Sequence, residues 1–124
     1  MPKKKNLTDR VPVVTLPALT LAQKHQRAFE RVLSELAQLH EKKSLDYGSD
    51  IDPLANIRAS NDFGIEPYVG ALLRLNDKVH RLKVYAVRGT LANEGAEDSL
   101  KDIVVYGAIA LQLFREKIAA ESVD

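Results

Sequence analysis

The sequence predicts an all-α protein: three long helices plus one short helix in a bundle, with an extended N-terminal arm. Three observations lead to this prediction. Three long segments carry apolar residues at alternating spacings of four and three, the period of a helix that packs against other helices. No segment of convincing length alternates apolar and polar residues as a half-buried strand does. Turns that contain glycine and asparagine separate the long segments.

Residues 1–17 are predicted to be the arm, and residues 18–124 a single helical domain. The arm begins with Lys3–Lys5 and continues with VPVVTLP, which contains two prolines and has no helical period. Two interpretations are open: the arm is disordered, or its apolar residues Val11, Val13, Val14 and Leu16 dock on the domain as an extended strap. The N-terminal residues MPKKKNLTDR are basic but lack the apolar h-region of a secretory signal, so no such signal is predicted.

The first long helix is predicted to begin near Thr20, which suits an N-cap, and to end near Tyr47 and Gly48. One face of this helix carries Phe29, Leu33, Leu36, His40 and Lys43. Lys43 and Tyr47 are four residues apart, so a cation and a phenol ring point toward the same interior. They could hold a phosphate and stack on a base, or be a lysine and a tyrosine of an ordinary core.

The connector from Gly48 to Gly64 is predicted to contain a short helix over Pro53–Ser60, with Asp52 as its cap. Asn56 and Arg58 in this connector could face a ligand. The alternative is a surface loop that satisfies only its own backbone.

The central helix is predicted over Glu66–Arg88, and its packing face carries Tyr68, Leu72, Leu75, Val79, Leu82 and Ala86. Beside that face Arg74, Lys78 and Arg81 form a cationic stripe. Charges that flank a buried face need partners. Either acidic residues of another helix supply them, or a phosphate group does.

The last helix is predicted from about Ala96 to about Ala120, with a packing face of Leu100, Val104, Gly107, Leu111, Phe114 and Ile118. Acidic residues gather at its start: Glu94, Glu97, Asp98 and Asp102. Asp98 and Asp102 are one turn apart and could share a Mg²⁺ ion. The helix dipole favours acidic residues in a first turn without any metal, which accounts for Asp98 better than for Asp102.

The composition limits the kinds of partner. The net charge of +1 gives no overall field that attracts nucleic acid, so nucleic-acid binding is not expected. The chain has no cysteine, which excludes disulfides and thiolate chemistry. No apolar run approaches the roughly 20 residues that span a bilayer, so a cytosolic protein that does not contact membranes is expected.

Three motifs together resemble one family: K-x-x-D-Y-G at Lys43–Gly48, R-L-x-D-K-x-x-R-L at Arg74–Leu82, and N-E-x-x-E-D-x-x-x-D-x-x-x-Y at Asn93–Tyr106. Their order and spacing are similar to those of the nucleotide modification associated domain family, type 1, a small helical domain of phages and bacteria. A looser similarity extends to the all-α nucleotide pyrophosphohydrolases of the MazG and dimeric dUTPase group. Those enzymes hold Mg²⁺ on acidic pairs and release pyrophosphate from nucleoside triphosphates. Their earlier E-x-x-E motif is missing here, where the central helix offers only Asp77.

The sequence therefore predicts a domain that handles nucleotides, and a Mg²⁺-dependent nucleotide phosphohydrolase is one form of it. In that form Asp98 and Asp102, with Asp77 or Glu94, hold the metal. Lys43, Arg74, Lys78 and Arg81 contact phosphate, while Tyr47 and Asn56 contact the base or sugar. The alternatives are a non-enzymatic nucleotide-binding or regulatory module and an oligomeric structural or interaction protein. A homodimer is expected in each case, because the long apolar faces leave surface to cover.

Overall fold

The computed structural model describes residues 12–13, 15–46, 51–91 and 95–122. The chain divides into two compact units, Met1–Leu33 and Ser34–Asp124. The division falls inside the first helix, α1 (Leu21–Leu45). All regular structure in the described ranges is helical, which confirms the predicted all-α class with three long helices and one short helix. No helix among these residues is long and apolar enough to cross a membrane.

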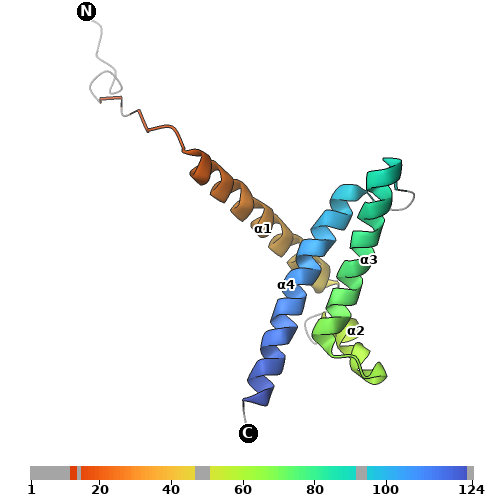
Figure 1. Cartoon of the computed structure of the whole chain (residues 1–124). Coiled ribbons are helices and arrows are strands. Elements are labelled where there is room, and N and C mark those ends of the chain that lie inside the picture. Colours follow the sequence, from red (N-terminus) through yellow and green to blue (C-terminus); the bar gives the residue numbers. More distant parts are fainter. Residues whose placement is uncertain (1–11, 14, 47–50, 92–94, 123–124) are drawn as a thin grey trace, which may run out of the picture. The chain divides into compact units, whose positions relative to one another are not determined.

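In the first unit, the described residues 12–13 and 15–19 form no regular secondary structure, and the N-terminal part of α1 follows them (Figure 1). Thr20 caps the helix as predicted. The backbone N–H of Gln23 donates to Thr20 Oγ1 at 3.1 Å, and the backbone N–H of Thr20 donates to Gln23 Oε1 at 3.0 Å. This reciprocal pair is a capping box, and it fixes the start of α1 at Leu21. Val13 and Leu16 of the predicted strap are exposed, while Val11 and Val14 lie outside the described residues.

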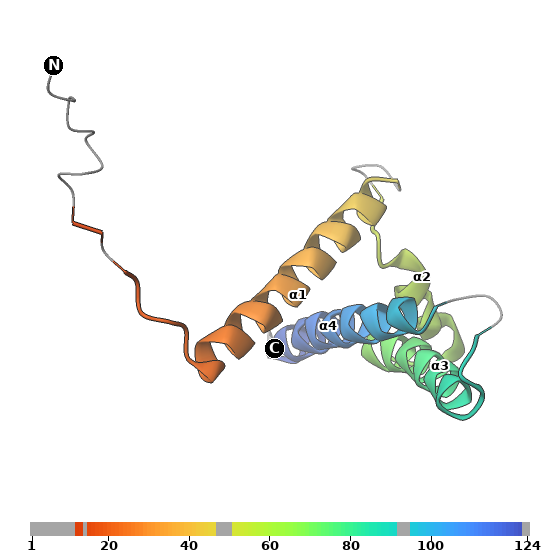
Figure 2. The same ribbon diagram turned by 90° about the horizontal axis from the view of Figure 1, so that it is seen from above.

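The second unit contains the rest of α1, α2 (Ala55–Arg58), the 3₁₀ turn η2 (Ala59–Phe63), α3 (Pro67–Arg88) and α4 (Ala96–Glu121). Helices α3 and α4 lie side by side and run antiparallel in both views (Figures 1 and 2). Pro67 suits the first turn of α3, where no intrahelical N–H is needed. Gly89 ends the helix with φ 76°, a left-handed conformation that glycine adopts without strain. The predicted bounds of α3 and α4 are confirmed to within one residue.

The core of the second unit lies where the connector, α3 and α4 meet. Its buried apolar residues are Leu54, Ile57, Ala71, Ile109, Ala110 and Leu113, and Tyr68, Val105 and Tyr106 pack against them. Ser99 is the buried polar residue among the described residues. Burying Leu54 and Ile57 fixes the connector on α3 and α4, since each buried aliphatic side chain contributes about 1.5–3 kcal/mol relative to exposure.

The buried face of α4 differs from the predicted one. Burial on α4 is greatest at Ser99, Ile109, Ala110 and Leu113. The predicted packing face stays exposed instead, at Leu100, Val104, Leu111, Phe114 and Ile118. The predicted packing face of α4 is therefore wrong: it is not the face that is buried in a single copy of the chain. Nearly every position from residue 103 to residue 111 is apolar, so the spacing alone could not choose between neighbouring faces.

Gly70 allows the connector to approach α3 closely. A Cβ atom at Gly70 would lie 2.8 Å from Ser60 Oγ and 3.3 Å from the carbonyl oxygen of Ile57. Ser60 cannot move away without cost, because its hydroxyl donates to the carbonyl of Ile65 at 2.9 Å. We expect Gly70→Ala to lower the free energy of unfolding by about 1–2 kcal/mol, even though alanine favours helix, and urea denaturation followed by circular dichroism measures this change.

Gly107→Ala provides the matched control. A Cβ atom there would meet only Leu75 Cδ1 at 3.8 Å, an ordinary van der Waals contact. The same substitution should therefore stabilise α4 by up to about 1 kcal/mol through helix propensity. Equal stability of the two variants would show that contact with Ser60 does not constrain Gly70.

Candidate functional site

A cavity of about 170 Å³ lies in the second unit, where the C-terminal part of α1 and the connector meet α3 and α4. It is lined by His40, Lys43, Ser44, Pro53, Leu54, Asn56, Ile57, Arg74, Asp102, Val105, Tyr106 and Ile109. Four residues that the sequence assigned to substrate or metal binding are in this set: Lys43, Asn56, Arg74 and Asp102. These four come from four separate segments, so the fold brings together what the sequence keeps apart.

Helical spacing explains each wall of the cavity. His40, Lys43 and Ser44 are three and four residues apart, so they share one side of α1. The Ser44 hydroxyl donates to the carbonyl of His40 at 2.9 Å. The α4 wall begins with Asp102 and continues through Tyr106 to Ile109, again at spacings of four and three. His40, which the sequence placed on the packing face of α1, is half-buried and lines the cavity.

Some charged residues of the cavity lining have an ion-pair partner within the described part of the chain and others do not. Neither Lys43 nor Arg74 forms an ion pair with another described residue. Asp102 does: its Oδ2 atom lies 3.0 Å from Lys78 Nζ, and the two side chains are 26% and 22% exposed. Because Lys78 offsets the charge of Asp102, the lining has a positive balance from Lys43 and Arg74. The cavity therefore suits an anion.

The other predicted residues lie away from the cavity or outside the described residues. Asp77 and Asp98 are exposed, and Arg81 is half-buried on α3. Tyr47 and Glu94 lie outside the described residues. Within residues 12–13, 15–46, 51–91 and 95–122, no group of three or more histidine, cysteine, aspartate or glutamate residues is placed to hold a metal ion. The Mg²⁺ site, which includes Glu94, stays a prediction.

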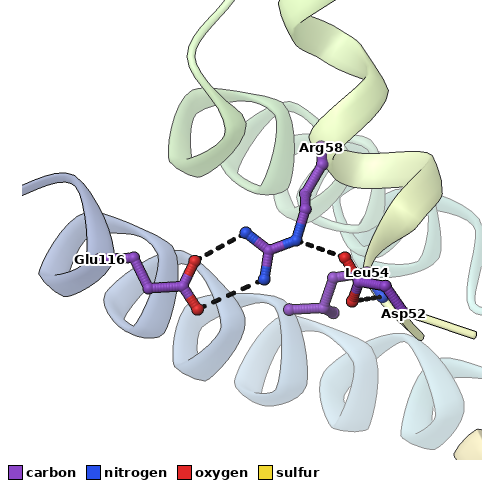
Figure 3. Close-up of polar contacts among 4 residues, drawn as sticks. All are labelled: Asp52, Leu54, Arg58 and Glu116. Atoms are coloured by element: carbon purple, nitrogen blue, oxygen red, sulfur yellow. Dashed lines mark hydrogen bonds and ion pairs between the residues drawn. The ribbon is translucent and has the colours of Figure 1, made fainter. Parts of the chain in front are cut away.

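Arg58 anchors the connector to α4 (Figure 3). Its Nη1 and Nη2 atoms donate to the two carboxylate oxygens of Glu116 at 2.6 and 3.3 Å, and its Nε donates to Asp52 Oδ2 at 2.5 Å. Asp52 Oδ1 also accepts the backbone N–H of Leu54 at 3.0 Å and so orders the turn before α2, whereas the N-cap position of α2 is Leu54 and not the predicted Asp52. Arg58 thus binds carboxylates of its own chain, although the sequence offered it as a ligand contact. Of the two connector residues that the sequence offered as ligand contacts, Asn56 and Arg58, it is Asn56 that lines the cavity.

These contacts shift the pKa values of the groups involved. The backbone N–H of Leu54, followed by Arg58, lowers the pKa of the Asp52 carboxyl. The hydrogen bond from Arg58 lowers the pKa of Glu116 and raises the pKa of Arg58 itself.

Another ion pair, formed by Lys101, connects α1 with α4 inside the second unit. Lys101 Nζ lies 3.3 Å from Glu35 Oε1 on α1 and 3.8 Å from Glu97 Oε2, one turn earlier on α4. The hydrogen bond to Glu35 is the main cause that raises the pKa of Lys101. Sequence reasoning missed this contact. Its only local signal was the spacing of Glu97 and Lys101, which says nothing about Glu35.

No family model, curated protein or solved structure matches this chain. The resemblance to the nucleotide modification associated domain family accordingly stays a prediction, and a proposal about function rests on the cavity.

The lowered pKa values of Asp52 and Glu116 predict acid sensitivity. Their ordinary values are 3.8 and 4.5. Because the folded state lowers both, their contribution to stability is present at neutral pH and is lost as the pH falls through the folded-state values. We expect the melting temperature of the native chain to fall more steeply between about pH 5 and pH 3 than that of Arg58→Met.

Arg27→Met is the control, since Arg27 is an exposed arginine of α1 that forms no ion pair within the described ranges. Its melting temperature should follow the native pH dependence. If Arg58→Met and Arg27→Met gave the same pH profile, Arg58 would not be what lowers the two carboxyl pKa values.

Proposed function

We propose that the second unit binds a phosphorylated small molecule, most specifically a nucleotide, in the cavity between α1, the connector, α3 and α4. One observation supports this most. Lys43 and Arg74 come from different helices, line the same cavity and have no carboxylate partner among the described residues. A guanidinium and an ammonium from different helices of one cavity can contact different oxygens of one phosphate group, through charge-assisted hydrogen bonds.

The size of the cavity indicates which part of the ligand it holds. Pockets that enclose a drug-sized ligand are about 300–1,000 Å³. A cavity of about 170 Å³ is smaller, so it accommodates one end of a nucleotide while the remainder lies over the rim. Asn56, Ser44 and Tyr106 also line the cavity and offer amide and hydroxyl groups for polar contacts. The predicted contact of Tyr47 with the base belongs to the same proposal.

The proposal is that the cavity binds a nucleotide. Hydrolysis of the bound nucleotide would be a further property. Asp102, a predicted metal ligand, pairs with Lys78, which satisfies both charges without a metal ion. The described geometry therefore favours the regulatory or binding module over the Mg²⁺-dependent phosphohydrolase. If a metal ion does bind, Asp98 and Asp102 are the carboxylates one turn apart that would hold it, and it would supply charge to the phosphate oxygens.

The first test is a thermal-shift screen of nucleoside mono-, di- and triphosphates, each with Mg²⁺ and with a chelator. A nucleotide at one hundred times its Kd should stabilise the fold by about 2.7 kcal/mol. We expect stabilisation that the chelator leaves intact. Stabilisation that requires Mg²⁺, together with pyrophosphate release, would support hydrolysis instead. No response to any nucleotide would contradict the proposal.

The cavity cations give the second test. Lys43→Met and Arg74→Met remove a charge and keep most of the aliphatic stem, so each should weaken nucleotide binding about tenfold or more in isothermal titration calorimetry. Lys83→Met is the matched control, because Lys83 is an exposed lysine of α3 outside the cavity lining. If all three variants lost affinity equally, binding would depend on overall charge and not on this cavity.

A further inference from the structure

An exposed apolar stripe runs along α4, separate from the cavity. Its side chains are Leu100, Val104, Leu111, Phe114 and Ile118, and their exposed fractions range from 39% to 54%. Val104, Leu111 and Ile118 repeat at intervals of seven residues. Leu100, Gly107 and Phe114 repeat at the same interval and occupy the second apolar position of the heptad. This is the pattern of a helix that packs against another helix along its whole length.

The stripe continues onto α3. The rings of Phe114 and Tyr68 form an edge-to-face contact with centroids 5.4 Å apart, and Leu75 Cδ1 lies next to Gly107. Tyr68 and Leu75 belong to a row of α3 residues spaced by three and four, which also contains Leu72 and Val79. Leu72 is 43% exposed. The α3–α4 hairpin therefore presents one apolar face made by both helices.

The opposite charges at the two ends of the stripe indicate what covers it. Glu97 and Arg115 are about 18 residues, or about five helical turns, apart, so they lie on the same edge of α4. Arg115 has no ion-pair partner in the described part of the chain. The Glu97 side chain lies 3.8 Å from Lys101 but is 84% exposed, so it can also meet a cation of a second copy. When two copies of α4 pack antiparallel about a two-fold axis, the same edges meet, and Glu97 of each copy lies beside Arg115 of the other.

We propose that this face is a homodimer interface, in which the α3–α4 hairpins of two copies pack with their α4 helices antiparallel. Two helical hairpins that bury their shared apolar faces form a four-helix arrangement. The cavity does not take part, because its α4 residues, Asp102 and Ile109 among them, belong to another side of the helix. The proposal is thus independent of nucleotide binding.

The first experiment measures the molar mass of the full chain by sedimentation equilibrium. We expect a dimer, and we expect Leu111→Glu to raise its dissociation constant at least about tenfold, since a carboxylate would enter the apolar seam. Leu73→Glu is the matched control. Leu73 is 51% exposed and Leu111 is 50% exposed, but Leu73 lies outside the row that adjoins the stripe. A monomer at every soluble concentration, or equal effects of the two variants, would overturn the proposed interface.

Charge reversal tests the orientation with two exposed residues. Glu97→Arg also replaces the carboxylate that lies 3.8 Å from Lys101, so Arg115→Glu is the single variant that tests the interface alone. Glu97→Arg should weaken the dimer, because it places two arginines together at each end, and so should Arg115→Glu. The double variant restores opposite charges and should recover the native dissociation constant. Recovery supports the antiparallel dimer. Failure to recover, with both single variants weakened, would overturn the antiparallel arrangement.

Discussion

The close packing of α3 against α4 is the constraint on which the second unit depends. Ala71 is fully buried and Ala110 nearly so, which lets the two helix backbones approach closely. Small residues at the centre of the contact leave the larger apolar side chains on either side of it. Ile109 is therefore available for the cavity lining, while Leu111 remains exposed on the stripe. The narrow contact line thus creates two distinct apolar regions on α4.

Ion pairs then position the other walls of the cavity. Arg58 joins the connector to α4 through Glu116, and Lys101 joins α1 to α4 through Glu35. Ion pairs as exposed as these contribute little stability, so the burial of Leu54 and Ile57 is what holds the connector. The wall formed by α1 has fewer apolar anchors, since Leu36 is the buried residue of its described part. Segments with few buried contacts open most easily, so this wall is the one that a ligand would order.

Local signals were sufficient to predict the helices. Thr20 predicted the start of α1, and the spacing of apolar residues predicted α3. The structure adds Gln23 to the cap and shows Pro67 and Gly89 at the two ends of α3. The packing face of α4 could not be predicted in the same way, because apolar residues surround that helix and its period fits two neighbouring faces equally well. Only the position of α3 decides between them, and no local pattern contains that information.

The candidate site was predictable by residue type but not by pairing. Arg74 was identified because cations beside an apolar face need partners. Lys43 was identified by its spacing from Tyr47, and Asp102 by its spacing from Asp98. The sequence could not say that Lys78 would take Asp102 and leave Arg74 for the cavity, since both cations lie on the same stripe. Nor could it pair Arg58 with Glu116 across such a distance in the chain. Ion pairs between distant helices depend on the packing of the chain, and they appear only once the fold is known.

Apolar residues lie on two sides of α4, the side that packs against α3 and the exposed stripe. A helix that is apolar on nearly all sides is normally covered on all sides. In a single copy of the second unit α4 is covered by α3 and the connector on one side only, with exposed leucine, valine and isoleucine on the other. The excess of apolar residues that obscured the packing face is therefore what a second packing face requires. The proposed ligand binding on the Asp102 side and the proposed self-association on the Leu111 side would use different sides of the same helix, so the sequence of α4 is compatible with both.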